Sequence, residues 1–324
     1  MGTDPRGKFH RHTLNTTTWK TAEDLKRQIE DGVLKKEPLK IEDATQNWLD
    51  ALRAAKRKER TVAQVHGPMV KSLVAWCNDL GYEQMDDLEK AEQEKGGVLD
   101  GWVKTWDYAT STHRSRIDDL ARQFFKFAIG RGWIATNPAK TLIKPKDDTE
   151  PTLPFTEEEE YRIFETAKKF PEVVRSCGGL WRENWVTALA LLYVLRWTGL
   201  RAQDAVLFEP RNIRTMNVKG ELVNVYETYP MKTGDWVLCP IPARITEFIK
   251  AAPRLSEEKA FMPIGDKRYK EDSRNVANNF YDSYLVPLSN FSEVEGIAAH
   301  RFRDTLAVRL LDDGKPLEIV QIML

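Results

Sequence analysis

Four basic side chains in the second half of the chain have the types and the spacing needed to act on a phosphate group. Arg201 stands in "RWTGLRAQD" and Lys232 in "MKTGDWVLCPIP", while "HRFRDT" holds both His300 and Arg303. Because His300 and Arg303 are three residues apart, a helix would place them on one face. A guanidinium can bind two phosphate oxygens at once, and lysine or histidine can transfer protons. The four residues could therefore hold a phosphate and catalyse a reaction at it.

Each of these side chains also has an ordinary structural explanation. Arg201 could pair with Asp204, three residues later, on the surface of a helix. A lysine on a tight turn, such as Lys232, is usually a solvated charge, and a histidine three residues from an arginine is often structural. No one of the four decides the function alone.

The elements around these residues follow from local patterns. The long apolar stretch predicts a buried helix over about 183–197, and Gly199 is a plausible C-cap, so Arg201 falls at the start of the next helix. Exposed N–H groups at a helix start also favour an anion. Between about 213 and 242, "LVNVYETY" and "DWVLCPIP" alternate around "KTGD", which predicts a hairpin with Lys232 at its tip.

The remaining sequence is predicted to be mainly helical and to form two domains. Residues 1–40 form a polar arm with a capped helix over 21–32. Residues 41–146 have apolar positions at helical spacing, which indicates a bundle of about four helices. A proline-rich linker at 147–155 leads to a second domain at 156–324, mostly helical with a small antiparallel sheet.

Composition limits the possible functions. Among 324 residues, 41% are apolar, enough for two cores, and the 49 basic residues equal the 49 acidic ones, so net charge gives no sign of a polyanionic partner. The longest apolar run is too short to span a membrane. Three widely separated cysteines (Cys77, Cys177 and Cys239) indicate neither a disulfide framework nor a metal site, and no GxxxxGK loop is present. The sequence predicts a cytoplasmic protein without membrane, metal or cofactor.

Taken together, the motifs resemble those of the tyrosine recombinases, or phage integrase family. "TGLRAQDAVLFEPRNI" resembles the first-arginine motif of that family, and "KTGDWVLCPIP" resembles its hairpin lysine motif. "HRFRDTLAVRLLDDGKPLEIVQIML" resembles the second-arginine box, and "ARQFFKFAIGRGWIATNPAKTLIKPK" the end of the core-binding domain. The resemblance covers about residues 41–324.

The resemblance implies an architecture and a partner. Residues 41–146 would be a helical, SAM-like core-binding domain, and 156–324 a catalytic domain with the DNA breaking-rejoining enzyme fold. Residues 1–40 would be an arm or the remnant of an arm-binding module. The partner would be a double-stranded recombination site of a phage or mobile element, bound by a homotetramer. Three cations before the linker would contact its phosphates, namely Arg114, Arg116 and Lys126.

The resemblance also implies the role of each site residue. Arg201 and Arg303 would clamp the scissile phosphate, and Lys232 would protonate the leaving 5′ oxygen. His300 would assist proton transfer or orient the phosphate, and Asp204 would support the first arginine's helix. Neither a metal nor a nucleotide cofactor is needed for this chemistry.

The tyrosine nucleophile is expected to be missing from the chain as given. In the family the second-arginine box continues through "LGH" or "LGW" to a tyrosine about a dozen residues later. The last of nine tyrosines here is Tyr284, before His300. The resemblance thus implies an interrupted recombinase that cannot cleave DNA by itself. One alternative is an inactive DNA-binding protein on the same scaffold. A type IB topoisomerase shares the chemistry but lacks this N-terminal bundle and linker.

Overall fold

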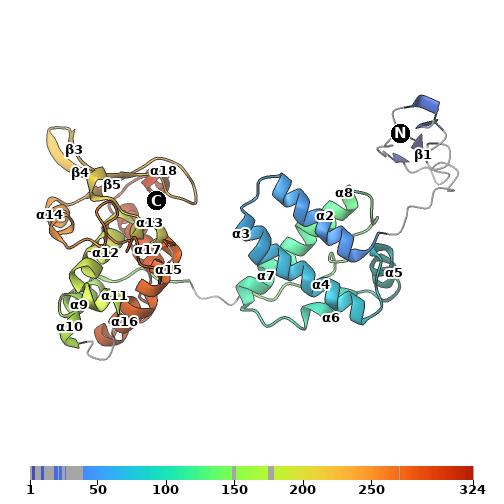
Figure 1. Cartoon of the computed structure of the whole chain (residues 1–324), viewed down its shortest axis with the longest axis horizontal. Helices are drawn as coiled ribbons and strands as arrows, with labels where there is room; N and C mark the ends of the chain where they lie inside the picture. Colours follow the sequence, from blue (N-terminus) through green and yellow to red (C-terminus); the bar gives the residue numbers. More distant parts are fainter. Residues whose placement is uncertain are drawn as a thin grey trace. The chain divides into compact units, whose positions relative to one another are not determined.

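The chain divides into two compact units, Met1–Glu150 and Pro151–Leu324 (Figure 1). The computed structural model describes residues 2–3, 9–10, 18–20, 22–23, 26, 39–147, 151–173, 179–269 and 271–323. The helix predicted over 21–32 lies mostly outside the described residues, as does Cys177. Two short strands near the start, β1 (Gly2–Thr3) and β2 (Phe9–His10), pair in antiparallel fashion.

The first unit is helical. Its elements are α2 (Ile41–Ala54), α3 (Glu59–Thr61), the π-helical η1 (Val62–His66), α4 (Gly67–Asp79), α5 (Met85–Lys95), α6 (Val98–Val103), α7 (Thr110–Asp119), the π-helical η2 (Leu120–Phe124) and α8 (Phe125–Gly130). Within residues 39–147 these make five continuous helical runs rather than about four. The extra break separates α5 from α6, because Gly96 and Gly97 have φ values of 65° and 62°, a region that favours glycine.

Aromatic side chains fill the core of this unit. Trp48, Trp102 and Phe124 are each at most 2% exposed. The ring of Trp48 lies 5.0 Å from that of His66 and 5.6 Å from that of Phe124. Full burial of a large apolar side chain stabilises a fold by roughly 1.5–3 kcal/mol. The contacts of Trp48 with His66 and Phe124 therefore hold α2, the run from α3 to α4 and the run from α7 to α8 together.

The second unit is mostly helical and has a small sheet. Its helices are α9 (Glu157–Lys168), α10 (Phe170–Val173), α11 (Leu180–Glu183), α12 (Trp185–Thr198), α13 (Ala202–Val206), the 3₁₀ turn η3 (Pro210–Asn212), α14 (Ala243–Ala251), α15 (Ser273–Phe280), the π-helical η4 (Tyr281–Leu285), α16 (Val286–Ser292), α17 (Ala299–Asp312) and α18 (Leu317–Met323). Its strands are β3 (Ile213–Val218), β4 (Glu221–Thr228) and β5 (Val237–Ile241).

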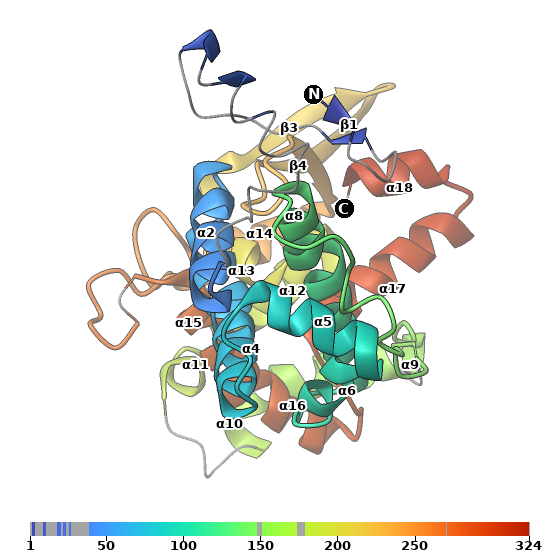
Figure 2. The ribbon, with the colours of Figure 1, turned by 90° about the vertical axis from the view of Figure 1, so that its right-hand side faces the viewer.

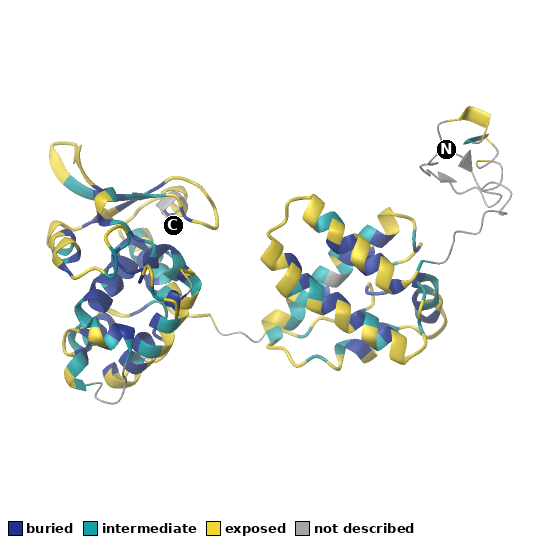
Figure 3. Cartoon of the chain, in the orientation of Figure 1, coloured by how far each residue is buried: buried dark blue, intermediate teal, exposed yellow. Residues whose placement is uncertain are grey.

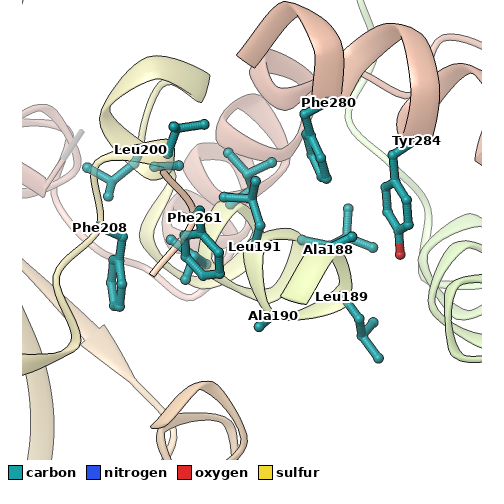
Figure 4. Packing of buried hydrophobic residues seen from close by; sticks show 14 of the residues in the cluster. Ala188, Leu189, Ala190, Leu191, Leu200, Phe208, Phe261, Phe280 and Tyr284 are labelled. Atoms are coloured by element: carbon teal, nitrogen blue, oxygen red, sulfur yellow. The ribbon is translucent and has the colours of Figure 1, made fainter. Parts of the chain in front are cut away.

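Helix α12 forms the centre of the second unit. The apolar run that predicts a buried helix is buried on nearly all sides (Figure 3). Ala188, Leu191 and Leu192 are at most 1% exposed. Figure 4 shows Ala188 and Leu191 in a cluster with aromatic rings that include Phe280 and Phe261. Truncation of such a leucine to alanine costs roughly 2–5 kcal/mol. Helix α12 therefore gives a rigid support to whatever follows its C-terminus.

The predicted antiparallel sheet is present, in the order β3-β4-β5. Its central strand pairs Tyr226 with Ile213 on one side and with Cys239 on the other. Helix α18 lies beside β5, and both views of the ribbon show it next to the sheet (Figures 1 and 2). Val320 of this helix is buried, whereas Ile319 is 44% exposed. The described helices include none with the length and apolar character of a membrane span.

Candidate phosphate-binding site

Arg201 lies where the central helix of the second unit ends. As predicted, Gly199 is the C-cap of α12 and has a left-handed backbone with φ 60°. Arg201 is then the N-cap of α13, with extended backbone angles (φ −65°, ψ 149°). The buried helix thus fixes the backbone position of Arg201, and its side chain remains partly exposed.

Arg303 reaches the same helix end from α17. Its Nη1 donates a hydrogen bond to the carbonyl oxygen of Gly199 across 2.7 Å. Burial lowers the pKa of the Arg303 guanidinium, and the nearby positive charge of Arg201 lowers it further. The two arginines are therefore neighbours, although 102 positions separate them in the sequence. Two like charges held together in a partly buried place favour the binding of an anion.

Both guanidiniums keep donors for a ligand. Within the described ranges, Arg201 has neither a hydrogen bond nor an ion pair, and Arg303 has only its bond to Gly199. The alternative pairing of Arg201 with Asp204 is absent from this part of the chain. Asp204 is instead 8% exposed, and its Oδ1 accepts a hydrogen bond from the backbone N–H of Met231 across 2.9 Å.

Lys232 lies in the loop that joins β4 to β5, directly after Met231. The residues of this loop from 231 to 236 are exposed. Trp236 at its far end donates from Nε1 to Glu227 Oε1 across 2.9 Å. The loop is thus held at both ends, by Asp204 and by Glu227, while Lys232 between them remains in solvent.

His300 occupies the first turn of α17, one turn before Arg303. Its side chain is 74% exposed, and Nε2 lies 3.8 Å from Asp304 Oδ1. Arg303 is more enclosed because it points to Gly199. Among the described residues, no direct contact joins His300 or Lys232 to either arginine. The structure thus brings the two arginines together, whereas Lys232 and His300 are exposed and make no described contact with them.

No strong nucleophile accompanies the arginines in the described residues. The thiol of Cys239 on β5 is near Arg303, but burial raises its pKa to about 12, so it is protonated at neutral pH. Burial also raises the pKa of Tyr226 and of Tyr284. Tyr229, which begins the lysine loop, is 66% exposed. Nor do three or more potential metal ligands gather anywhere in the described ranges.

The three predicted DNA contacts of the first unit differ in their surroundings. Arg114 donates to the Pro145 carbonyl and Arg116 to the Val65 carbonyl, each across 2.6 Å. Lys126 is exposed on α8. The sequence reasoning did not single out Arg122, which is four residues before Lys126 and has a side chain 75% exposed. Their i, i+4 spacing was the available signal, since it places two cations on one helix face.

Solved structures show which fold this is. No protein-family model and no curated protein matches the chain. A lambda integrase dimer bound to a COC′ core site has a TM-score of 0.56 at 15% identity, covering 99% of this chain and 87% of that chain. Lambda integrase bound to DNA gives 0.55 at 14% identity, covering 88% and 91%. The Tn1549 transposon integrase with a circular intermediate DNA gives 0.53 at 14%, covering 86% and 90%. The chain therefore has the fold of the tyrosine recombinases.

Proposed function

We propose that the chain is a site-specific DNA recombinase in which Arg201 and Arg303 bind the scissile phosphodiester. One observation carries the proposal. The two guanidiniums converge at the end of α12, one held by the Gly199 carbonyl and the other without a protein partner in the described ranges, so both can donate to one phosphate. The integrase fold supports the reading that this phosphate belongs to DNA.

The proposed reaction uses each residue of the site. A tyrosine hydroxyl loses its proton to solvent and its oxygen attacks the phosphorus, the bond from phosphorus to the 5′ oxygen breaks, and a 3′-phosphotyrosyl ester forms. The arginines stabilise the charge that develops on the nonbridging oxygens. Lys232 gives a proton to the leaving 5′ oxygen, a contribution of roughly 10²–10⁴-fold in rate. His300 assists from the first turn of α17. The last tyrosine of the sequence is Tyr284, before His300. The four basic residues of the site are therefore assigned phosphate binding and proton transfer only.

The proposed partner is duplex DNA, held by both units. Residues 41–146 would act as the core-binding domain and 156–324 as the catalytic domain, with 147–155 as the linker. Lambda integrase is known as a dimer on a COC′ core site and as a tetramer on a Holliday junction. We infer that this protein also assembles as a tetramer on its recombination site.

A joining assay tests the site without the need for a tyrosine. A duplex selected from a random library for binding is prepared with a nick, a 3′-(p-nitrophenyl) phosphate on one side and a 5′-hydroxyl on the other. Joining forms a bond from phosphorus to the 5′ oxygen, releases p-nitrophenolate, and transfers the hydroxyl proton to Lys232 or solvent. The release is followed by absorbance and the joined strand by electrophoresis. Residues 1–324 should accelerate both.

The variants separate the proposal from its alternative. Arg201→Ala or Arg303→Ala should abolish acceleration and leave most DNA affinity, because affinity is spread over many phosphates. Lys315→Gln, an exposed cation on the same unit, serves as the control. Binding without any acceleration by the unaltered chain would show an inactive DNA-binding protein on this fold. On a nicked duplex with ordinary phosphates no covalent adduct should form. An adduct that forms and is lost in Tyr229→Phe would contradict the expectation that residues 1–324 contain no tyrosine nucleophile.

A further inference from the structure

Helix α17 contacts the start of the second unit through a buried hydrogen bond. This contact is made by a different side chain from Arg303, which bonds to Gly199. The backbone N–H of Phe155 donates to Thr305 Oγ1 across 2.8 Å, a buried hydrogen bond between positions 150 residues apart. The same hydroxyl donates to the carbonyl of Arg301 across 2.7 Å. Thr305 therefore both accepts and donates through its hydroxyl, and it connects the start of the second unit to the helix of His300 and Arg303.

Arg301 also connects α17 to the start of the second unit, through contacts with Leu153, Glu159 and Phe155. Its Nε donates to the Leu153 carbonyl across 2.9 Å, and its Nη2 lies 3.1 Å from Glu159 Oε1. Its Cζ is 4.0 Å from the centre of the Phe155 ring. The Arg301 side chain is only 12% exposed, so these contacts replace water around most of the guanidinium. We call Leu153, Phe155, Glu159, Arg301 and Thr305 the α17 clamp.

Charge and packing reinforce the α17 clamp. Burial raises the pKa of the Glu159 carboxyl, but a hydrogen bond from the Thr156 N–H and the charge of Arg301 outweigh it, and the pKa is lowered overall. The Phe155 ring also lies 4.8 Å from that of Phe302. Arg301 stands between His300 and Arg303 in sequence. The turn of helix that carries both is therefore fixed by the segment on which the linker ends.

We propose that Arg301 and Thr305 are positioning residues, which set Arg303 for phosphate binding by holding α17 to residues 153–159. This inference rests on the proposed recombinase function. Arg303 meets the Gly199 carbonyl from one side of α17, and the α17 clamp holds that helix from another. Loss of the clamp frees the first turns of α17 to shift relative to α12. A displacement of about 1 Å at a reacting group can lower a rate by roughly a hundredfold.

The test compares clamp variants in the full chain with two readouts. Thr305→Val removes the hydroxyl at nearly constant shape, and Arg301→Gln removes the guanidinium. Thr305→Ser retains the hydroxyl. Arg162→Gln is the matched control, since Arg162 also donates from α9 to a carbonyl, that of Glu293 across 3.3 Å, but does not contact α17 through it. Hydrogen exchange of a peptide over 151–157 reports the clamp, and the joining assay at saturating DNA reports Arg303.

The expected results are specific to positioning. Thr305→Val and Arg301→Gln should speed exchange at 151–157 and lower the joining rate about ten- to a hundredfold, with DNA affinity unchanged within about twofold. Thr305→Ser and Arg162→Gln should match the unaltered chain. In an Arg303→Lys background, Arg301→Gln should lower the rate no further, because its effect passes through Arg303.

Contrary results are also distinct. Faster exchange at 151–157 with an unchanged joining rate would overturn the positioning role and leave the recombinase proposal intact. Arg301→Gln could also lower the joining rate by the same factor in a chain with Arg303 and in a chain with Arg303→Lys. That result would show a general structural effect and would overturn the positioning role too. DNA binding by the unaltered chain without any joining would refute the proposed function first, and the positioning role with it.

Discussion

The carboxylate of Asp204 accepts a hydrogen bond from the backbone N–H of Met231 across 2.9 Å, and this bond connects the helix that begins after Arg201 with the loop that holds Lys232. Asp204 is buried, so water competes weakly for its oxygen. Asp204 thus bonds to the loop of Lys232, and within the described residues it does not pair with Arg201.

Asp204→Ala should therefore loosen the lysine loop. A hydrogen bond to a charged group contributes roughly 1.5–3 kcal/mol, and we expect a loss of unfolding free energy in that range. Hydrogen exchange at 229–236 should rise, and the joining rate should fall while DNA affinity remains. Asp235→Asn, in the same loop, is the control. Unchanged exchange at 229–236 would show that the bond does not hold the loop.

A buried carboxylate joins three helices of the second unit. Glu160 Oε1 lies 2.6 Å from Arg196 Nε on α12, and Glu160 Oε2 lies 2.7 Å from Arg309 Nη2 on α17. Glu160→Gln removes the negative charge and leaves two cations close together. Breaking a buried pair in this way costs roughly 3–5 kcal/mol, which urea unfolding should show. An effect below about 1 kcal/mol would mean that water reaches the group freely.

The ion pair of Glu159 with Arg301 should make the second unit sensitive to acid. The pKa of Glu159 is lowered from its usual 4.5 in the folded chain. Between the folded pKa and the unfolded value of 4.5, the unfolded chain binds more protons than the folded chain. The stabilisation by Glu159 is therefore present above pH 4.5 and is lost as pH falls through the folded pKa. Glu159→Gln should lower the unfolding free energy by about 1 kcal/mol near neutral pH, and the difference should shrink on acidification. A difference that grows in acid, or an equal effect of the exposed Glu158→Gln, would contradict this.

The cations of the first unit should divide into two kinds. Lys126→Ala should reduce the slope of log affinity against log salt by about 0.9 and leave stability unchanged, as expected for one phosphate contact. Arg116→Ala should instead lower stability, because the Val65 carbonyl loses its donor. Salt titrations and urea unfolding of both variants give the comparison. A salt slope for Lys126→Ala equal to that of the unaltered chain would show that Lys126 makes no phosphate contact.

Local features of the site were predictable from sequence, and distant contacts were not. Gly199 ends α12 because its backbone needs a positive φ, and the position of Arg201 follows directly. The strands around Lys232 follow from alternation. The bond from Arg303 to Gly199, by contrast, spans 104 residues and depends on how α17 packs against α12. For the same reason Arg301, which lies one residue after His300 and two before Arg303, gave no signal in the sequence.

The predicted DNA contacts show the same limit. A helix pattern indicates which residues share a face, but Arg114 and Arg116 turn toward backbone carbonyls that lie 31 and 51 residues away. A charged side chain on a helix therefore cannot be assigned to solvent or to the fold from its spacing alone. Lys126, which has no such carbonyl among the described residues, is the one of the three that remains exposed.

The central claim is that Arg201 and Arg303 hold the same phosphate, and neutralising single phosphates tests it most directly. A methylphosphonate replaces one phosphate at a time in the selected duplex, and affinity is measured for the unaltered chain, Arg201→Ala and Arg303→Ala. The unaltered chain should lose affinity when the replaced phosphate is the one at which a nick supports joining. Both variants should be insensitive to replacement at that same position and normal elsewhere. Insensitivity at two different phosphates, or at none, would contradict the shared site.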